Sequence, residues 1–436
     1  MTPGIARIRC KAEGNPRQIY TTLYHHVYNQ ELLRQCYDSI DGRRAVGIDG
    51  VSKAAYGKDL VNNLSDLSRR LGNMCYYHQP SRRSYIDKAG STKKRPLGIS
   101  CFEDKIVEKA FKEVLEAIYE QKFIRSSYGY RPHLSCHDAL RALGRIIQKG
   151  KINYVVEADI KGFFNHVHHK MLMKLLAYRI KDKRILRMIL KMLKSGIMED
   201  GLVTASEEGT PQGSILSPLL SNIYLHYCLD GWFEQIFKAK CRGEAHFFRY
   251  ADDFVACFQY QSDAALYLAE LEKRLAIFHL ETEPSKTKLL AFGRFAEENA
   301  RKQGRKPETF DFLGFTHYCG KTRNGYFKVK RRTSRMKFTH KLKEFNVWLK
   351  KNRSFLKTRE LLGTAKRKWQ GHLNYYAITD NLRRCDAFGY QMVRLLFKWL
   401  NRRSQRRSYT WEQFYDVLRW IGWPPIRVKV DLCPCR

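Results

Sequence analysis

The stretch His246–Phe258 (HFFRYADDFVACF) constrains the fold of this chain more than any other stretch. Apolar and aromatic residues flank two adjacent carboxylates, Asp252 and Asp253, a pattern that predicts two buried strands joined by a tight turn. Two neighbouring carboxylates repel each other and are stabilised by a cation between them. The pattern therefore predicts either a cation-binding turn at the end of a buried sheet or an ordinary Asp–Asp hairpin turn, since Asp is a common turn residue.

The charge of the chain indicates what kind of molecule it binds. Its 436 residues carry 80 Lys and Arg against 43 Asp and Glu, a formal net charge of +37. Such an excess favours a polyanionic partner, of which nucleic acid is the commonest. No apolar stretch is long enough to span a bilayer, the N-terminus lacks the apolar core of a secretory signal, and the twelve Cys include no CxxC pair. We therefore expect a cytoplasmic protein with no membrane partner, no zinc ribbon and no disulfide framework.

The spacing of apolar residues predicts an α+β fold. The elements expected in the middle of the chain are a strand at 152–160, helices at about 167–176 and 184–193, a helix opened by 209–212, the 246–258 hairpin, a helix at 264–278 and a strand at 288–292. This order is typical of a split βαβ sheet with helices on one face. Residues 294–309 lack apolar periodicity and are predicted to form a loop.

The flanking regions are predicted to be mainly helical. Helices are expected within 1–45 and at 60–71, 104–121 and 136–147, and a basic extended stretch at 82–100. Residues 321–410 carry 26 Lys and Arg against 4 Asp and Glu, together with Trp and Tyr residues at helical spacing. The cations favour phosphate binding, and the aromatic rings either stack on unpaired bases or form the core of a helix bundle.

Asp159 is a further candidate for cation binding, because it ends the predicted strand at 152–160. If this strand pairs with the 246–258 hairpin, three carboxylates meet at one point. Oxygen ligands of this kind select Mg²⁺, and two such ions stabilise the attacking and leaving oxygens of a phosphoryl transfer. Taken alone, Asp159 would favour the alternative of a helix N-cap at a strand–helix turn.

Several other residues are candidates for nucleotide contacts. Phe164 follows Asp159 closely and could pack under a sugar, or could belong to the core. Gln212 and Gly213 lie in a GTPQG segment that suits either a nucleotide or a loop at a helix start. Lys88 and Arg95 could bind a triphosphate, or could lie on a solvated loop.

Tyr250–Asp253 (YADD) resembles the YxDD box of reverse transcriptases, and it stands among similar boxes in the order of that family. These are GIDGV (47–51), RPLGI (95–99), SYGYRP (127–132), ADIKGFF (158–164), GTPQGSILSPLLSNIYL (209–225), PSKT (284–287) and FLGF (312–315). Two later segments, WQGHLNYY (369–376) and RRSQRRSYTW (402–411), resemble the thumb, or maturase, region of group II intron-encoded proteins. Over roughly residues 40–420 the chain is thus similar to a bacterial group II intron-encoded reverse transcriptase/maturase without an endonuclease domain.

The resemblance implies a right-hand polymerase fold with helical and strand-containing fingers, an RRM-like split βαβ palm and a helical-bundle thumb. The implied divisions are an N-terminal extension (1–45), fingers (46–150), a palm with parts of the fingers interleaved (151–315), a thumb or maturase domain (316–415) and a short tail (416–436).

The resemblance also implies roles for individual residues. Asp159, Asp252 and Asp253, with the Ile160 carbonyl, would bind two Mg²⁺ ions, for which Mn²⁺ could substitute. Lys286 would donate a proton to the leaving pyrophosphate, although Glu283 stands where that box usually carries Asn.

The remaining implied contacts are with nucleotides and nucleic acids. Lys88 and Arg95 would contact the triphosphate, Phe164 would discriminate the sugar, Gln212 and Gly213 would touch the nucleotide or template, and Phe312, Leu313 and Gly314 would form the primer grip. Basic residues of the thumb are expected to bind RNA or duplex: Arg331, Arg332, Arg335, Lys366, Arg367, Lys368, Arg402, Arg403, Arg406 and Arg407.

The function expected from these features is that of an RNA-directed DNA polymerase. It would copy an RNA template from a DNA primer or target with dNTPs, and bind its intron RNA to assist splicing and mobility near the bacterial nucleoid. Without HNH-like sequence, no endonuclease activity is expected. The alternatives are a domesticated reverse transcriptase in host defence, repair or spacer acquisition, and an RNA-binding splicing cofactor without polymerase activity, which the intact Asp residues disfavour. An RNA-dependent RNA polymerase is disfavoured by Phe164.

Overall fold

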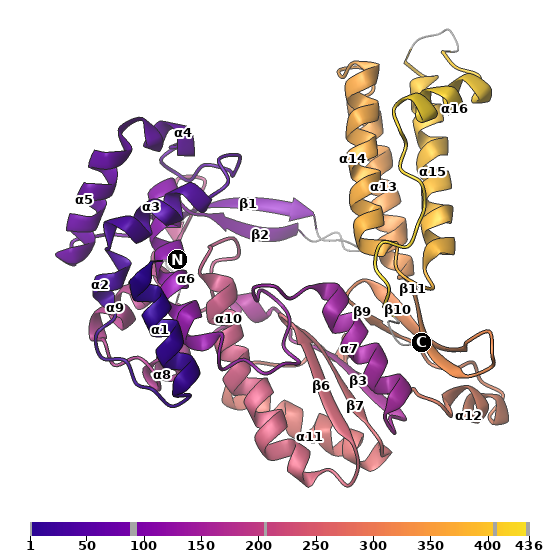
Figure 1. Cartoon of the computed structure of the whole chain (residues 1–436), viewed down its shortest axis with the longest axis horizontal. Coiled ribbons are helices and arrows are strands. Elements are labelled where there is room, and N and C mark those ends of the chain that lie inside the picture. The colour runs from indigo at the N-terminus through magenta and orange to yellow at the C-terminus, as the bar shows by residue number, and fades with distance from the viewer. Residues whose placement is uncertain (1, 88–93, 205–206, 404–407, 433–436) are drawn as a thin grey trace.

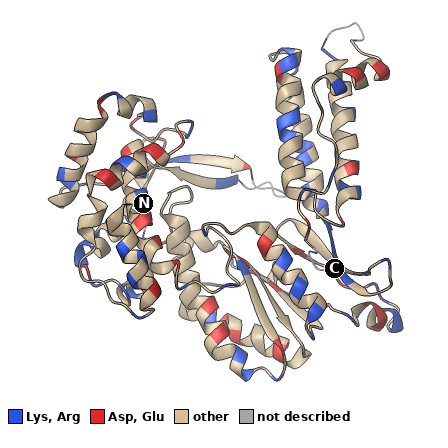
Figure 2. Ribbon diagram, in the orientation of Figure 1, with Lys and Arg blue, Asp and Glu red and all other residues tan. Residues whose placement is uncertain are grey.

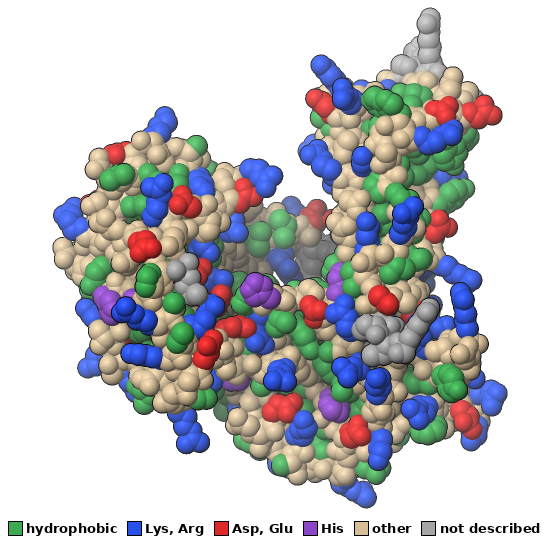
Figure 3. Space-filling model, viewed as in Figure 1, with side chains coloured by type: hydrophobic (Ala, Val, Ile, Leu, Met, Phe, Trp, Pro, Cys, Tyr) green, Lys and Arg blue, Asp and Glu red, His purple; other side chains and the backbone are tan. Residues whose placement is uncertain are grey.

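The computed structural model describes residues 2–87, 94–204, 207–403 and 408–432, which form three lobes (Figure 1). A helical lobe formed largely by the N-terminal part of the chain and a helical bundle near the C-terminus rise on either side of a central lobe that is built on a four-stranded sheet. The space-filling view shows a deep hollow between the two flanking lobes (Figure 3). Within the described residues, no helix has the length and apolar character needed to cross a membrane.

The central sheet has the strand order β6–β7–β3–β8, with every neighbouring pair antiparallel. Its strands are β3 (Tyr154–Asp159), β6 (Ala245–Tyr250), β7 (Asp253–Phe258) and β8 (Lys288–Ala291). The helices of this lobe are α7 (Cys136–Lys149), α10 (Ser217–Leu225) and α11 (Gln261–Ile277), with short helical turns at Phe163–Asn165, His226–Asp230, Phe233–Phe237, Lys238–Lys240 and Pro284–Lys286. The structure thus confirms the predicted sheet strands and the hairpin.

Helices cover both faces of this sheet, so the prediction of helices on one face is wrong. Val156 and Ala256 pack in one apolar core with α10 and α11, whereas Val155 and Val255 pack in a second core with α7. Successive residues of a strand point to opposite faces, and β3 and β7 are apolar on both. The order of elements alone does not reveal this, because α7 precedes the first strand and reaches the second face from outside the βαβ unit.

The N-terminal lobe surrounds α6 (Phe102–Tyr119), a helix that is buried on nearly all sides. Its other helices are α1 (Pro3–Gly14), α2 (Tyr24–Val27), α3 (Gln30–Ser39), α4 (Lys53–Tyr56), a short turn at Gly57–Asp59, α5 (Leu60–Gly72), α8 (His169–Ala177) and α9 (Lys183–Leu193). A second sheet, of order β2–β1–β4–β5, consists of β1 (Ser81–Asp87), β2 (Lys94–Ile99), β4 (Ile197–Glu199) and β5 (Leu202–Thr204). Figure 1 shows β1 and β2 reaching from this lobe toward the C-terminal bundle.

The C-terminal part begins with a three-stranded sheet and continues as a helix bundle. The sheet has the order β11–β10–β9, from β9 (Phe310–Phe312), β10 (Phe315–Lys321) and β11 (Phe327–Thr333). The helices are α12 (Ala296–Lys302), before the sheet, then α13 (Arg335–Asn352), α14 (Thr358–Tyr376), α15 (Leu382–Leu400) and α16 (Trp411–Trp420). Trp369 and Trp399 are buried in the bundle core, as expected from one of the two alternatives for the aromatic residues.

Two local predictions are corrected. Residues 294–309 were predicted to form a loop but contain the helix α12. Ala296 is the one residue that this helix buries, so its sequence shows no apolar periodicity. The helix expected to open at 209–212 begins at Ser217, with Pro218 in its first turn, where the missing proline N–H costs no helical hydrogen bond. Residues 209–213 instead form a loop that belongs to the candidate site.

Candidate active site

The register of the central sheet brings two of the predicted carboxylates together. Asp159 ends β3 and Asp253 begins β7, and the two residues are direct partners in the antiparallel ladder. Asp252 directly precedes Asp253, in the turn between β6 and β7, where Ala251 has a φ of 58°. Because directly opposed side chains on one pair of strands lie close together, these acidic groups share one end of the sheet.

The electrostatics of these groups show how unfavourable their crowding is without a cation. Burial raises the pKa of Asp253 to about 8, with further contributions from the charges of Asp159 and Asp252. Burial also raises the pKa of Asp252, which the nearby cations Arg95 and Lys286 partly offset. An ion with oxygen ligands would relieve this repulsion.

Lys286 lies beside the carboxylates, as its motif predicts. Its ammonium donates to an oxygen of Asp159 in an ion pair. Burial would lower the pKa of Lys286, but the hydrogen bond and charge of Asp159, with Glu283 and Asp253, outweigh burial and raise it. Lys286 is therefore held as a cation. The N–H of Glu283 also donates to the Asp159 carbonyl over 2.8 Å. This bond holds the short helical turn Pro284–Lys286 beside the end of β3.

A buried ion pair supports the turn from beneath. Arg249 donates to both oxygens of Asp230 over 2.7 and 2.6 Å, and neither side chain is exposed. Burial would raise the pKa of Asp230, but the charge and hydrogen bonds of Arg249 outweigh it and lower that pKa. The same guanidinium donates to the Ala251 carbonyl over 2.9 Å, so the ion pair fixes the residue before Asp252.

The SYGYRP segment packs on the turn from the other side. Gly129 lies so close that a Cβ atom there would come within 2.2 Å of the Ala251 nitrogen, so only glycine fits. The Asn222 side chain donates to the Gly129 carbonyl over 2.7 Å and accepts from Arg249 over 2.9 Å. Sequence reasoning missed Arg249, Asp230 and Asn222; the signal that could have found them is a polar residue in an otherwise apolar strand or helix.

The predicted primer-grip residues reach the carboxylates through the backbone. Leu313 has a φ of 51° and its N–H donates to the Asp253 carboxylate. Phe312 is buried and Gly314 has a φ of 78°, so the three residues form a tight connection between β9 and β10. The Leu313 carbonyl accepts a hydrogen bond from the Tyr375 hydroxyl over 2.8 Å, and this bond joins the β9–β10 turn to α14.

The loop 209–213 is held against the segment that carries Phe164. The Thr210 N–H donates to the Phe164 carbonyl over 2.7 Å, and a Cβ on Gly209 would meet that carbonyl oxygen at 2.9 Å. Phe164 and Gln212 line the same cavity of about 280 Å³, which also contains Arg83 and Pro96. The structure thus brings together two residues that the sequence places 48 positions apart.

The same loop contacts β2 on its other side. Gly213 has a φ of 123° and its Cβ position lies 2.4 Å from the Gly98 carbonyl oxygen, while the Gly98 N–H donates to the Gln212 carbonyl over 2.7 Å. Gly213 therefore lets the backbone of the 209–213 loop lie close against the backbone of β2, where a side chain would collide with it. Arg95 lies on β2, exposed, near enough to Asp252 and Tyr130 to lower the pKa of each, although burial leaves both pKa values raised. Lys88 lies outside the described residues.

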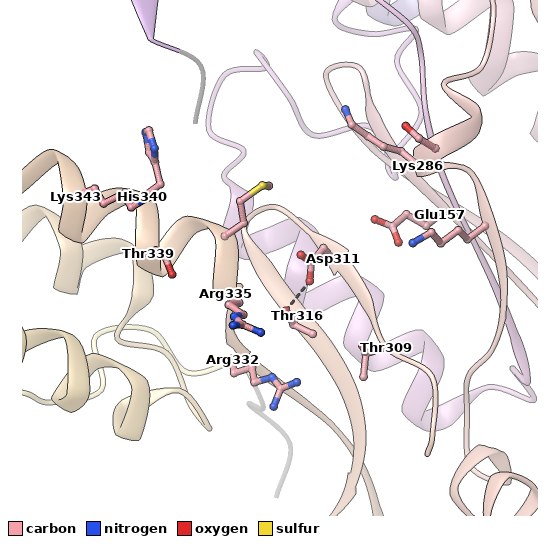
Figure 4. Close-up of a pocket in the computed structure, with 13 residues that line it drawn as sticks. Glu157, Lys286, Thr309, Asp311, Thr316, Arg332, Arg335, Thr339, His340 and Lys343 are labelled. Atoms are coloured by element: carbon pink, nitrogen blue, oxygen red, sulfur yellow. Dashed lines mark hydrogen bonds between the residues drawn. The ribbon is translucent and has the colours of Figure 1, made fainter. Parts of the chain in front are cut away.

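A larger cavity of about 740 Å³ lies between the central sheet and the start of the C-terminal bundle (Figure 4). Glu157 and Lys286 line one side of it, and Arg332, Arg335 and Lys343 line the other, from β11 and α13. Burial, with the charge of Asp311, raises the pKa of Glu157 to about 7. The far wall of this cavity is strongly basic and faces Glu157 and Lys286, the lysine that is paired with Asp159.

The structure separates the predicted RNA-binding cations into exposed and buried ones. Arg331 is 1% exposed and donates to the Leu140 carbonyl over 2.8 Å, so the prediction that it contacts RNA is wrong. Its β-strand alternates sides, and its side chain points inward to α7. Lys366 and Arg403 are partly buried and donate to carbonyls of Ile421 and Leu356.

The exposed cations of this set are Arg332, Arg335, Arg367, Lys368 and Arg402, whereas Arg406 and Arg407 lie outside the described residues. Figure 2 shows that Lys and Arg are numerous on the helices of the bundle. These positions remain predictions of nucleic-acid contacts.

The donor set fits a hard divalent cation. The crowded groups at the end of the sheet are carboxylates, the ligand type that hard divalent cations prefer, and their pKa values are raised by burial and by their mutual repulsion. Among the described residues, no group of three or more His, Cys, Asp or Glu side chains is arranged to hold an ion by itself.

Buried carboxylates at the end of an antiparallel sheet, beside a basic cavity, are the arrangement that a metal-dependent phosphoryl-transfer enzyme needs. Residues 86–317, more than half of the chain, match the family described as reverse transcriptase (RNA-dependent DNA polymerase). The chain belongs to this family, whose members generally use divalent metal ions.

Curated relatives agree with this assignment. The chain is 36% identical over 222 residues to the group II intron-encoded protein LtrA of Lactococcus lactis subsp. cremoris. The aligned region covers 51% of this chain and 37% of that protein. It is 38% identical over 207 residues to the protein YkfC of Escherichia coli (strain K12), covering 47% and 54%. It is also 36% identical over 210 residues to an uncharacterised 91 kDa protein in a cob intron of Schizosaccharomyces pombe, covering 48% and 26%. The chain thus spans about a quarter to a half of these relatives' lengths.

Proposed function

We propose that this chain is an RNA-directed DNA polymerase of the group II intron type, which copies RNA into cDNA and binds its intron RNA to assist splicing and mobility. The observation that carries the proposal is the pairing of Asp159 with Asp253 at the end of the sheet, beside Asp252 and Lys286. Membership of the reverse transcriptase family and the similarity to an intron-encoded protein support it.

In this proposal the three lobes have the roles of a right hand. The central sheet with Asp159 is the palm (151–315), the lobe around α6 with β1 and β2 supplies the fingers (46–150, with interleaved parts), and β11 with α13–α15 and the start of α16 is the thumb (316–415). The described part of the extension at 1–45 packs in the same apolar core as α6. The tail at 416–436 begins within α16, and its Leu418 and Leu432 pack in the core of the bundle.

The metal site would consist of Asp159, Asp252 and Asp253, with the Ile160 carbonyl, and would bind Mg²⁺ ions or Mn²⁺ in their place. Such ions would stabilise the attacking and leaving oxygens of phosphoryl transfer. The Arg249–Asp230 pair holds Ala251, and so the turn, in place. Lys286, held as a cation beside Asp159, would protonate the leaving pyrophosphate.

The substrate contacts follow from the surroundings of this site. Arg95, on β2, would bind the triphosphate of the dNTP together with Lys88, which lies outside the described residues. Phe164 with Gln212 and Gly213 would contact the sugar and base of the dNTP. The Phe312–Gly314 connection would position the DNA primer end through Leu313. The basic wall of the 740 Å³ cavity, with Arg332 and Arg335, would follow the backbone of the RNA–DNA product.

The experiment that tests this proposal is dNTP incorporation on an RNA template with an annealed DNA primer and Mg²⁺. We expect incorporation by the wild type and none by Asp252→Ala/Asp253→Ala, because the variant lacks the ligands that the turn presents. Arg34→Ala, in an exposed ion pair of α3, serves as a control and should incorporate like the wild type. A folded wild type that incorporates no dNTP on several templates would contradict the polymerase and favour an RNA-binding cofactor.

A further inference from the structure

Leu313 has a backbone conformation that leucine rarely adopts. Phe312 and Phe315 are partners in the antiparallel ladder, so Leu313 and Gly314 are the two central residues of the hairpin between β9 and β10. Both have a positive φ, 51° and 78°, as in a type I′ turn, in which these positions favour Asn, Asp or Gly. A bulky side chain is strained at such a φ, and the conformation persists only where the surroundings hold it.

Two hydrogen bonds of the Leu313 backbone hold this turn. The Leu313 N–H donates to the Asp253 carboxylate, and the Leu313 carbonyl accepts from the Tyr375 hydroxyl over 2.8 Å. Asp253 is paired with Asp159 at the end of the central sheet, whereas Tyr375 lies in the last turn of α14. The turn is therefore a direct link between the C-terminal bundle and the carboxylates.

Tyr375 is itself held in place by contacts with the central lobe and with β10. The Nε2 atom of His137, in the first turn of α7, lies 2.8 Å from the Tyr375 carbonyl, and it must donate because a carbonyl only accepts. The Tyr375 ring stacks on Phe315 with centroids 5.7 Å apart and planes 19° apart. The Cys136 thiol is in hydrogen-bonding contact with the hydroxyls of Tyr375 and Tyr250. These contacts fix the ring in the orientation in which its hydroxyl reaches the turn.

We propose that Tyr375 is a positioning residue for the polymerase reaction, which through Leu313 fixes the turn that would hold the primer end against the carboxylates. The proposal rests on the proposed polymerase function and adds to it a contact by which the position of the bundle acts on the reacting end. Arg367 and Lys368, which are predicted to contact RNA, lie on the same helix α14. One helix thus joins RNA held on the bundle to the primer end.

The neighbouring tyrosine provides a matched control. Tyr376 also packs on Phe315, with centroids 5.2 Å apart, but the hydroxyl that donates to Leu313 is that of Tyr375. Tyr375→Phe and Tyr376→Phe each remove one hydroxyl and keep the ring. Only Tyr375→Phe removes the bond to the turn.

The first measurement requires no catalysis. A DNA primer with 2-aminopurine as its 3′ nucleotide is annealed to an RNA template and bound to the full chain, and its fluorescence reports how the terminal base is held. We expect a smaller fluorescence change on binding for Tyr375→Phe than for the wild type and Tyr376→Phe. The affinity for the primer–template should stay within about twofold in both variants, because it depends on many phosphate contacts.

The second measurement is the rate at which the first nucleotide is added, in single-turnover reactions with Mg²⁺ and saturating dNTP. Tyr375→Phe should be about three- to tenfold slower than Tyr376→Phe, which is the range of one neutral hydrogen bond. Thermal melts of the two variants should agree, since each loses one hydroxyl.

Leu313→Gly tests whether Tyr375 acts through the turn, because glycine adopts a positive φ without strain. In the Leu313→Gly background the turn depends less on the tyrosine, so Tyr375→Phe should slow the reaction by a smaller factor than in the wild-type background. The same factor in both backgrounds would mean that the hydroxyl acts through Cys136 and Tyr250 instead, and would overturn the proposal.

Wild-type fluorescence and wild-type rates in Tyr375→Phe would overturn the positioning role, as would equal losses in Tyr375→Phe and Tyr376→Phe. If the wild type incorporates dNTPs in these assays, the proposed polymerase stands and only this role fails. A wild type that binds the primer–template but incorporates nothing overturns the proposed polymerase, and the role of Tyr375 with it.

Discussion

Arg249 shows how a single residue can control the geometry of a site that it does not enter. Its side chain is fully buried beneath the turn that carries Asp252, where it joins Asp230, Asn222 and the Ala251 carbonyl in one network. A buried ion pair adds little net stability relative to an apolar pair, yet losing one partner leaves a charge uncompensated. The network therefore holds the turn in one conformation, and substitution of any of its residues is expected to destabilise the protein.

Arg249→Ala should destabilise the protein by about 3–5 kcal/mol, because Asp230 would be left as an unpaired buried charge. The free energy of unfolding in urea measures this effect. Arg34→Ala removes an exposed pair with Asp38 and should cost about 0.3–0.5 kcal/mol. Arg249→Lys keeps the charge but cannot donate to both oxygens of Asp230 in the bidentate geometry of a guanidinium. We expect dNTP incorporation to fall in this variant even where the protein still folds. Equal unfolding free energies for the Arg249 and Arg34 variants would contradict this account.

At the scale of elements, α6 is connected through one buried carboxylate to the segment that follows the 209–213 loop. Glu108 accepts from the Ser100 hydroxyl and the Ile215 N–H over 2.7 Å each, and from His78 over 3.1 Å. Burial would raise the pKa of Glu108, but these donors outweigh it and lower that pKa. The ionised side chain thus fixes the position of the loop that carries Gln212.

Glu108→Gln should therefore raise the KM for dNTP about tenfold with a smaller fall in kcat, since a hydrogen bond to a charged group contributes about 1.5–3 kcal/mol. The amide places an N–H₂ group opposite a donor, which loosens the loop without removing bulk. Steady-state incorporation kinetics provide the measurement. Glu113→Gln, on the same helix in a partly exposed pair with Lys109, is the control and should leave the KM unchanged. Equal effects on KM and kcat would indicate a general loss of structure instead.

The bundle should also respond to pH through His372. The pKa of this group lies at about 3 in the folded chain, below its ordinary value, so the unfolded chain binds the proton more readily. Stability is then full above about pH 6.5 and falls as the pH drops toward 3. Between pH 7.5 and pH 5, the wild type should lose about 2 kcal/mol more than His372→Phe, which has no proton to gain.

Tryptophan fluorescence during urea unfolding is the suitable measurement for this prediction. Of the seven Trp residues, all but Trp232 lie in 348–423, so the signal reports mainly on the bundle. If His372→Phe and the wild type lose the same free energy between these pH values, the buried imidazole is not held neutral in the folded chain.

The elements also show which features of this protein follow from sequence patterns. The Asp159 and Asp253 strands were predictable because alternating and continuous apolar runs mark buried strands, and their ends carry the acidic groups. The contact of Phe164 with the 209–213 loop could only be expected from the resemblance, because it depends on tertiary packing across 48 residues. Arg331 was misplaced because charge alone does not tell which face of a strand is buried.

At the scale of the whole molecule, charge and shape agree. The +37 excess is not spread evenly, since residues 321–410 carry much of it, and the basic wall with Arg335 and Lys343 faces Glu157 and Lys286 of the central lobe. A nucleic acid bound at this wall would have its phosphates beside these cations.

This arrangement predicts a local dependence of binding on salt. Replacing Arg335 and Lys343 by Gln should lower the slope of log affinity against log salt by about 2 for an RNA–DNA primer–template, since each phosphate contact contributes about one. Lys350 and Lys351 lie in the last turn of the same helix α13 and line no described part of that cavity, so replacing both by Gln changes the net charge equally. The slope of this control should change much less. If the slope of log affinity against log salt falls equally in the two double variants, net charge and not the basic wall determines binding. The proposed contact of Arg335 and Lys343 with the nucleic acid is then wrong.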